Sequence, residues 1–291
     1  MLAYLDPARR GLVRLVRQEI AIAVHIHGVK EGCMSVTFSD IPGRLASRGH
    51  YTVVRRLEGG HRNLSFLVRD KAGTEFVAKT SRRCQQSMAW VVRLQREATK
   101  VGLNAPLYLQ APGGSYITGD MTLELMAHGR PATDGELSLV RPAMAVLRRA
   151  TKNFDQRPGF RSAAQLLSES RSGDVDLGDM PANIVRACRM AWAPLKGRQE
   201  VAVHGDLNST NLLIGPDGRP ILIDWDEARR DAAVFDLAPF RPSAGRMAIA
   251  RLAWEVAAGW RIEPIYAKAL AVRLLQVTSG LKLNASKSKR Q

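Results

Sequence analysis

The chain has 291 residues, of which 45% are hydrophobic and 24% are charged, a composition typical of soluble globular proteins with one large or two smaller domains. No run of 18 apolar residues occurs, so we expect neither a transmembrane helix nor a signal peptide. Its three cysteines lie far apart, which disfavours a disulfide framework or a zinc site and favours a cytoplasmic location.

The formal net charge is +16, which indicates either an anionic partner, such as nucleic acid, a phosphorylated metabolite or an acidic membrane, or a generally basic surface. The charges are scattered, except in the last ten residues, 282–291, which we expect to form a frayed basic tail. This scatter favours a generally basic surface. A nucleic-acid partner is therefore disfavoured without being excluded.

Residues 1–48 are predicted to form a basic helical extension. Apolar residues between Leu12 and Val24 recur at helical spacing, with arginines nearby. A helix of this kind can lie on a membrane surface or pack against the domain that follows, and we favour packing. No function follows from this segment.

Residues 49–126 are predicted to form a nucleotide-binding lobe, in which strands from Tyr51 onward alternate with a glycine loop and a turn. Gly59 and Gly60 would let the backbone approach a phosphate, although a Gly-Gly pair is also common in hairpin turns. Lys79 ends the third strand of this series, from which it could reach the α- and β-phosphates of a nucleotide.

A helix is predicted from Ser87 to Val101, because its apolar residues are spaced for one buried face. Glu97 lies close to that face, where it would pair with Lys79 as in kinases, or else it is an exposed residue on the helix flank. A later strand ends at Glu124 to Met126 and leads into a linker. Backbone groups at Glu124 and Met126 would then lie against the edge of an adenine ring.

Residues 127–281 are predicted to form a mostly helical lobe that contains the most informative motif of the chain. The sequence over 204–211 has the pattern His-x-Asp-x-x-x-x-Asn, and an apolar strand then ends at Asp224. Turn residues between two short apolar strands predict a hairpin that brings Asn211 and Asp224 to the same end. In phosphoryl transfer one carboxylate receives the proton of the substrate hydroxyl, while an amide and a second carboxylate hold Mg²⁺.

In this order the motifs resemble the aminoglycoside phosphotransferase and choline kinase-like family, a branch of the protein-kinase-like fold, over about residues 50–260. The resemblance is most specific at His204-Gly205-Asp206 and at Ile223-Asp224-Trp225-Asp226. It implies an α+β fold of two lobes, with an antiparallel sheet and one helix in the first and a mostly helical second lobe. It also implies ATP or GTP, together with Mg²⁺, in the cleft between them.

The resemblance also implies a role for each matching residue. Asp206 corresponds to the catalytic base. Asn211 and Asp224 correspond to the metal ligands. Lys79 corresponds to the phosphate-binding lysine, and Glu97 to the acidic residue that holds it.

Two further residues match supporting positions: His204 would brace the loop, and Asp236 would cap the helix after the catalytic segment. Gly205 stands where protein kinases carry the arginine that binds a phosphorylated activation loop, and Asp224-Trp225-Asp226 stands in place of Asp-Phe-Gly. Only 12 positions separate residues 224 and 236 (236 minus 224), which leaves little room for a peptide-docking segment. We therefore expect a small-molecule hydroxyl as acceptor and no regulation by loop phosphorylation.

An ATP-dependent kinase of small molecules is the leading hypothesis. Two alternatives stay open: an atypical protein kinase, and a non-catalytic nucleotide- or RNA-binding protein with a kinase fold. The basic net charge weakly disfavours a polycationic acceptor. It is compatible with an anionic or neutral metabolite, or with a sugar on a lipid or nucleoside.

Overall fold

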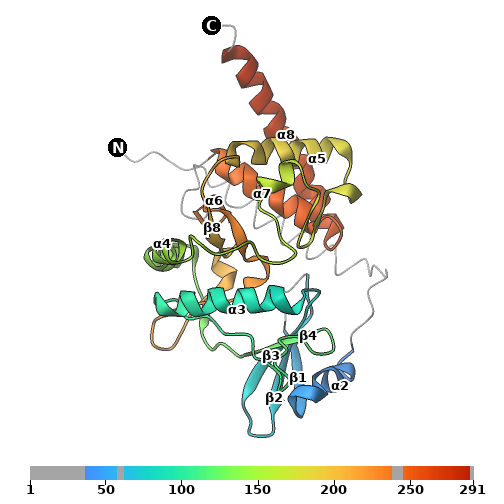
Figure 1. Ribbon diagram of the computed structural model, residues 1–291, viewed down its shortest axis with the longest axis vertical. Coiled ribbons are helices and arrows are strands. Elements are labelled where there is room, and N and C mark those ends of the chain that lie inside the picture. The colour runs from blue at the N-terminus through green and yellow to red at the C-terminus, as the bar shows by residue number, and fades with distance from the viewer. Residues whose placement is uncertain (1–36, 58–61, 238–244, 289–291) are drawn as a thin grey trace. The chain divides into compact units, whose positions relative to one another are not determined.

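The computed structural model describes residues 37–57, 62–237 and 245–288, which belong to a compact unit that begins at Thr37. Within this unit an antiparallel sheet with one long helix is followed by a mostly helical lobe (Figure 1). This confirms the predicted α+β fold of the kinase-like type. None of the helices in the described ranges is both long and apolar enough to cross a membrane.

The sheet of the N-terminal lobe has the strand order β1-β2-β3-β4, and each strand is antiparallel to its neighbours. The elements of this lobe are α2 (Asp40–Leu45), η1 (Ala46–Arg48), β1 (Tyr51–Leu57), β2 (Ser65–Asp70), β3 (Glu75–Thr80), α3 (Gln85–Lys100) and β4 (Met121–Leu125). In β3 the side chains of Phe76 and Ala78 are buried. Lys79 therefore points to the opposite face of the sheet, because successive side chains of a strand alternate.

The N-terminal lobe begins before the predicted boundary at residue 49. Ile41 and Leu45 on α2 are completely buried. Arg48 donates a hydrogen bond of 2.6 Å to the backbone carbonyl of Tyr116. Residues 37–48 are thus part of this lobe, because the apolar side chains of Ile41 and Leu45 are buried in its core. The rest of the predicted extension lies outside the described residues.

Helix α3 lies between the sheet and the helical lobe (Figure 1). Its buried residues recur at the helical period that the sequence predicts. One core cluster joins this helix, through Leu94, to Met144 on α4 (Arg141–Ala150) and to Leu207 and Trp225 beside the catalytic motif. The position of the catalytic segment is therefore fixed by the same apolar core that seats α3.

The C-terminal lobe is mostly helical. In its described residues, short strands between the helices form four β-ladders. Its remaining elements are β5 (Arg130–Pro131), η2 (Asp134–Val140), η3 (Gln165–Leu167), β6 (Arg171–Ser172), β7 (Val175–Asp176), η4 (Leu177–Asp179), α5 (Ala182–Trp192), η5 (Ala193–Leu195), β8 (Glu200–Val203), η6 (Ser209–Asn211), β9 (Leu212–Ile214), β10 (Pro220–Leu222), η7 (Trp225–Glu227), β11 (Arg229–Ala232), α6 (Val234–Leu237), α7 (Gly245–Gly259) and α8 (Pro264–Ser288). A second core cluster contains Trp192, Phe235 and Trp254.

Helix α8 continues through Ser288, beyond the predicted end of the lobe at residue 281. The segment 282–288 contains neither proline nor glycine, so its sequence offers no residue that would end a helix. The predicted frayed tail is therefore helical as far as Ser288.

Candidate active site

The loop that follows β8 carries the predicted catalytic motif, and Asp236 fixes its backbone. The buried Asp236 carboxylate accepts hydrogen bonds from the amides of His204 (2.9 Å) and Gly205 (3.0 Å). Gly205 has a φ of +86°, and a Cβ atom there would lie 2.4 Å from the carbonyl oxygen of Glu227, so only glycine fits. His204 Nε2 donates to the carbonyl of Ile223 at 3.0 Å. His204 thus braces the loop, and Asp236 supports this loop from within α6 instead of capping a helix.

Asp206 is partly exposed, and three side-chain donors hold its carboxylate. Asn208 Nδ2 donates to Oδ1 at 3.0 Å, and Asn211 Nδ2 donates to Oδ2 at 2.9 Å. Arg251 on α7 donates to Oδ1 at 3.1 Å. The structure therefore brings the predicted base and the predicted amide together. Asn208 was not predicted from the sequence, although asparagine is a common helix N-cap and Asn208 caps η6. Arg251, 45 positions from Asp206, had no sequence signal.

The predicted hairpin is formed by β9 and β10. Ile223, just after β10, donates its amide proton to the carbonyl oxygen of Asn211 at 3.0 Å. Asn211 and Asp224 therefore lie at the same end of the hairpin, as predicted. Asp224 has a φ of +61°, in the left-handed region, which non-glycine residues adopt mainly at turns and functional sites.

Lys79 contacts two carboxylates that follow this hairpin. Its Nζ atom lies 2.6 Å from Asp224 Oδ1 and 2.9 Å from Asp226 Oδ2. Burial acts to lower the pKa of Lys79, but the two carboxylates outweigh it and the pKa is raised. Burial likewise acts to raise the pKa of Asp226, but the Lys79 ammonium and the Arg83 guanidinium lower it well below its usual range. The site thus contains a half-buried ion cluster. The sequence assigned roles in it to Lys79 and Asp224 but none to Asp226.

The structure does not bring Glu97 to Lys79, which corrects the predicted pair. The Glu97 carboxylate instead accepts a hydrogen bond of 2.7 Å from Lys100, one turn further along α3. At about 100° per residue, Glu97 lies roughly 120° around the helix from the buried stripe through Val91 and Ala98. The alternative, a residue on the helix flank, therefore describes Glu97.

The backbone groups of Glu124 and Met126 face the neighbouring strand, which corrects their predicted contact with adenine. The Met126 amide donates to the Glu75 carbonyl at 3.0 Å, and Glu124 lies opposite Val77. Because hydrogen-bonded pairs alternate along an antiparallel ladder, Glu124, two residues before Met126, also directs its backbone toward β3. The backbone of Leu125 between them points away from β3, to the side where Tyr108 and Leu109 contact β4. The predicted strand that leads into a linker is present, as β4.

The Glu124 side chain, in contrast, lies close enough to Lys79, Asp224 and Asp226 for their charges to affect its pKa. It is half-buried, on the same face of the sheet as Lys79. Burial raises the pKa of Glu124 to about 8; the Lys79 charge opposes this rise, whereas the Asp226 and Asp224 charges add to it. Glu124 is therefore a neutral carboxylic acid near pH 7.

Gly59 and Gly60 lie outside the described residues, so their contact with a phosphate stays a prediction. Arg62, in the next described segment, contacts the C-terminal lobe: its guanidinium lies 2.8 Å from Glu227 and 3.0 Å from Glu263. Burial acts to raise the pKa of Glu227, but Arg62 and other nearby guanidinium groups lower it to about 2. These contacts join residues more than 160 positions apart in the chain, and they were not predicted from the sequence.

Comparison with known proteins shows the family of the chain. A model of the phosphotransferase enzyme family (APH) matches residues 53–268, which is more than half of the chain. The chain belongs to this family. The predicted enzyme class, a small-molecule phosphotransferase, is thereby confirmed. No curated protein shows significant sequence similarity to this phosphotransferase.

Solved structures share its fold at low sequence identity. LicA in complex with AMP is 13% identical with a TM-score of 0.57, over 83% of this chain and 98% of that chain. The GDP and kanamycin complex of APH(2")-IIia is 13% identical with a TM-score of 0.54, over 82% and 98%. A putative fructosamine-3-kinase from Thermobifida fusca YX-ER1 is 14% identical with a TM-score of 0.51, over 85% and 99%.

The donor atoms of the phosphotransferase site fit a hard divalent cation. Asn211 uses its Nδ2 on Asp206 and Asp224 uses Oδ1 on Lys79, so one oxygen of each has no hydrogen-bond partner within the described ranges. Mg²⁺ prefers such oxygen ligands and keeps several waters. No cluster of three or more His, Cys, Asp or Glu side chains that could hold a metal occurs in the part of the chain that the structure covers. A cation would therefore use one amide oxygen, one carboxylate, water and substrate phosphate.

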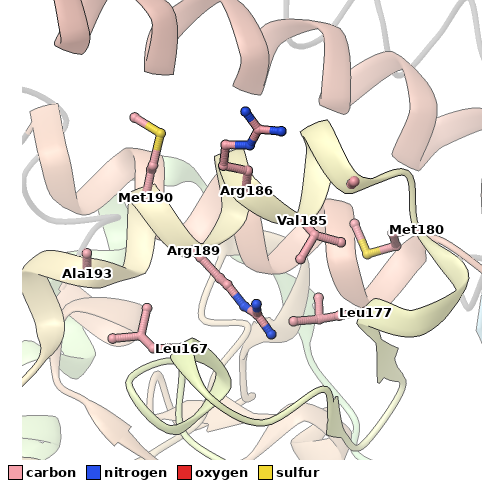
Figure 2. A pocket seen from close by; sticks show the side chains of 9 residues that line it. Leu167, Leu177, Met180, Val185, Arg186, Arg189, Met190 and Ala193 are labelled. Carbon is pink, nitrogen blue, oxygen red and sulfur yellow. The ribbon is translucent and has the colours of Figure 1, made fainter.

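A surface hollow of about 760 Å³ lies along α5 of the phosphotransferase (Figure 2). Its lining is mostly apolar, with two arginines, and consists of Leu167, Leu177, Met180, Ala182, Val185, Arg186, Arg189, Met190 and Ala193. None of these residues belongs to the catalytic loop, the hairpin or the surroundings of Lys79. The hollow is therefore distinct from the candidate active site.

Proposed function

We propose that this phosphotransferase moves the γ-phosphoryl group of ATP or GTP to a hydroxyl of a small molecule, with Asp206 as general base. One observation carries the proposal: the motif residues Asp206 and Asn211 are hydrogen-bonded to each other, and Asp224 follows at the same end of the hairpin, bonded to Lys79. Phosphoryl transfer depends mainly on positioning and on charge stabilisation, which these groups supply.

Each residue has its own task in this proposal. Asp206 accepts the proton of the acceptor hydroxyl as its oxygen attacks the phosphorus. The hydrogen bonds from Asn211 and Arg251 keep the Asp206 carboxylate in one orientation while the acceptor approaches. Asn211 and Asp224 would hold Mg²⁺, which when bound neutralises charge on the phosphate oxygens. Lys79 would leave Asp224 to contact the α- and β-phosphates.

The nucleotide base would lie beside the C-terminal end of β4. The ladder register supports the carbonyl of Leu125 and the amide of Ala127 as its backbone partners, because these groups point away from β3. The neutral Glu124 side chain lies on the same face of the sheet as Lys79 and could donate its carboxylic proton to a ring nitrogen.

The acceptor is proposed to be a small anionic or neutral molecule. The short segment between residues 224 and 236 leaves little room for a docked peptide. Arg251, which lies beside the base, and the net charge of +16 both disfavour a polycation. Phosphorylated sugars, neutral sugars and nucleosides are therefore the first acceptors to test.

The proposal is tested by measuring phosphate transfer from labelled ATP and GTP to these acceptors, to an aminoglycoside, to casein and to RNA. Asp206→Ala should lower kcat by about 10²–10⁴-fold and leave the Kd of Mg-nucleotide within about threefold. Asp224→Ala should instead raise that Kd by about tenfold or more. Asp217→Ala, in the exposed turn of the same hairpin, is the matched control and should change neither.

Near-normal turnover by Asp206→Ala would show that another group accepts the proton. Transfer to casein alone would favour the protein-kinase alternative. RNA binding that weakens steeply with salt, without transfer to any acceptor, would favour the non-catalytic alternative.

A further inference from the structure

The phosphate-binding lysine of this chain has no acidic partner on the helix that packs beside it. Glu97 is the one acidic residue of α3, and it is bonded to Lys100. The buried stripe of α3 offers Gln95, a neutral amide, whose Nε2 donates to the carbonyl of Pro106. A lysine that binds phosphates must nevertheless be held by an opposite charge, because a buried ammonium without a partner is costly.

Two carboxylates contact Lys79, but their surroundings differ. The Asp224 side chain is 39% exposed, and its second oxygen has no hydrogen-bond partner within the described ranges. The Asp226 side chain is only 16% exposed, and both of its oxygens are occupied. Its Oδ2 contacts Lys79 at 2.9 Å and accepts from Asn63 at 2.5 Å, while its Oδ1 accepts from Tyr108 at 3.1 Å. Asp224 is thus free to turn toward another ligand, whereas Asp226 is fixed.

The backbone of Asp226 is held as firmly as its side chain. Its carbonyl oxygen accepts a hydrogen bond of 2.8 Å from the buried Arg157 guanidinium, which also donates to the Ala228 carbonyl at 2.8 Å. Asn63 lies just after the glycine-loop segment, and Tyr108 is buried beside β4. Asp226 therefore connects three parts of the nucleotide-binding lobe to the end of the catalytic hairpin.

We infer that Asp226 is the positioning residue of Lys79 and takes the place that a helix glutamate has in other kinases. The inference rests on the proposed function, since it takes Lys79 as a phosphate ligand. When a nucleotide binds, Asp224 is released from Lys79, while Asp226 keeps the ammonium directed at the phosphates. Asp226 is not inferred to be a metal ligand, because Lys79, Asn63 and Tyr108 already use its oxygens.

The test measures the Kd of ADP and ATP at saturating Mg²⁺, by calorimetry and without acceptor, for the full chain and its variants. Asp226→Asn should raise the Kd about tenfold. Glu97→Gln, the matched acid-to-amide change on α3, should stay within twofold of the parent chain. A rise with Glu97→Gln equal to that with Asp226→Asn would overturn the inference.

A double-mutant cycle separates positioning from a merely structural role. In a Lys79→Met background, Asp226→Asn should change the nucleotide Kd by less than twofold, because the lysine that it positions is gone. Full additivity of the two changes would contradict the inference. The inference would also be contradicted if Asp226→Asn left the nucleotide Kd normal at saturating Mg²⁺ but raised the half-saturating Mg²⁺ concentration more than fivefold. That result would identify Asp226 as a metal ligand.

Thermal melting checks that each variant is folded. If Asp226→Asn does not fold, Tyr108→Phe removes one support of Asp226 with little change in shape, and it should raise the nucleotide Kd about threefold; no change would overturn the inference. If the parent chain binds nucleotide without transferring phosphate, the proposed function is refuted. The double-mutant cycle still tests the inference, because it measures only the nucleotide Kd. A parent chain that binds no nucleotide would refute both.

Discussion

The catalytic loop and the surroundings of Lys79 belong to one site, but they are assembled differently. Around Asp206 the motif contacts are local: Asn208 and Asn211, two and five positions along the chain, donate to its carboxylate. Around Lys79 they are distant, because its partner Asp224 is 145 positions away. Spacing in sequence therefore brings the motif groups of the first region together, whereas the contacts of the second depend on how two lobes pack.

This difference indicates where substitutions should have effects that the motif alone does not explain. A motif specifies which chemical groups are present. Long-range contacts decide whether these groups are held in a productive orientation, and they come from residues outside the motif. The first two predictions below change such a residue.

The largest effect is expected from Asp236, which reaches the catalytic loop from 31 or more positions away. Asp236→Ala leaves the buried amides of His204 and Gly205 without an acceptor, which should lower the free energy of unfolding by about 2–5 kcal/mol. Urea denaturation measures this loss, and kcat should fall by more than tenfold in the folded fraction. The exposed hairpin variant Asp217→Ala should stay within about 0.5 kcal/mol of the parent chain. Equal stability of the two variants would mean that the loop holds its shape by local contacts alone.

An intermediate effect is expected from Arg251, which contacts the Asp206 carboxylate and the Leu207 carbonyl. Arg251→Met keeps most of the side-chain volume but removes both hydrogen bonds. Because Arg251 orients the proposed base and does not contact Lys79, kcat should fall about tenfold with the nucleotide KM unchanged within twofold. Arg261→Met, which removes a mostly exposed arginine from the same lobe, should alter neither constant. A change confined to the nucleotide KM would show that Arg251 acts on nucleotide binding and does not orient Asp206.

The sequence predicted most of the fold and the local half of the site. The His-x-Asp-x-x-x-x-Asn motif and the hairpin are defined by residues a few positions apart, so their geometry followed from spacing. Glu97 was misplaced because a helical period gives the buried stripe but does not say which partner a flanking residue meets. The contact of Asp226 with Lys79 had no signal, because the tertiary fold alone brings residues 147 positions apart (226 minus 79) into contact.

The smallest effect, and the most specific in pH, is expected from Glu124→Gln. Burial raises the pKa of Glu124 from an unfolded value near 4.5 to about 8, so the folded state binds an extra proton between these values. Stability from this group is present at low pH and is lost as the pH rises toward 8. Glutamine imitates the neutral acid at every pH, so the variant should gain Tm relative to the parent chain between pH 5.5 and 9, by about 3 °C for each kcal/mol.

The control for this prediction is Glu136→Gln, which removes a carboxylate with the opposite shift. Hydrogen bonds from Arg130 and from Thr133 lower the pKa of Glu136 to about 2, so Glu136 is ionised in both folded and unfolded states above pH 5.5. The Tm difference of this variant should therefore stay constant from pH 5.5 to 9. If the Glu124→Gln difference is also constant over that range, Glu124 is ionised in the folded protein. The surroundings of Glu124 would then be more polar than the contacts beside Lys79 imply, and the neutral hydrogen-bond donor that we assign to the nucleotide base would be absent.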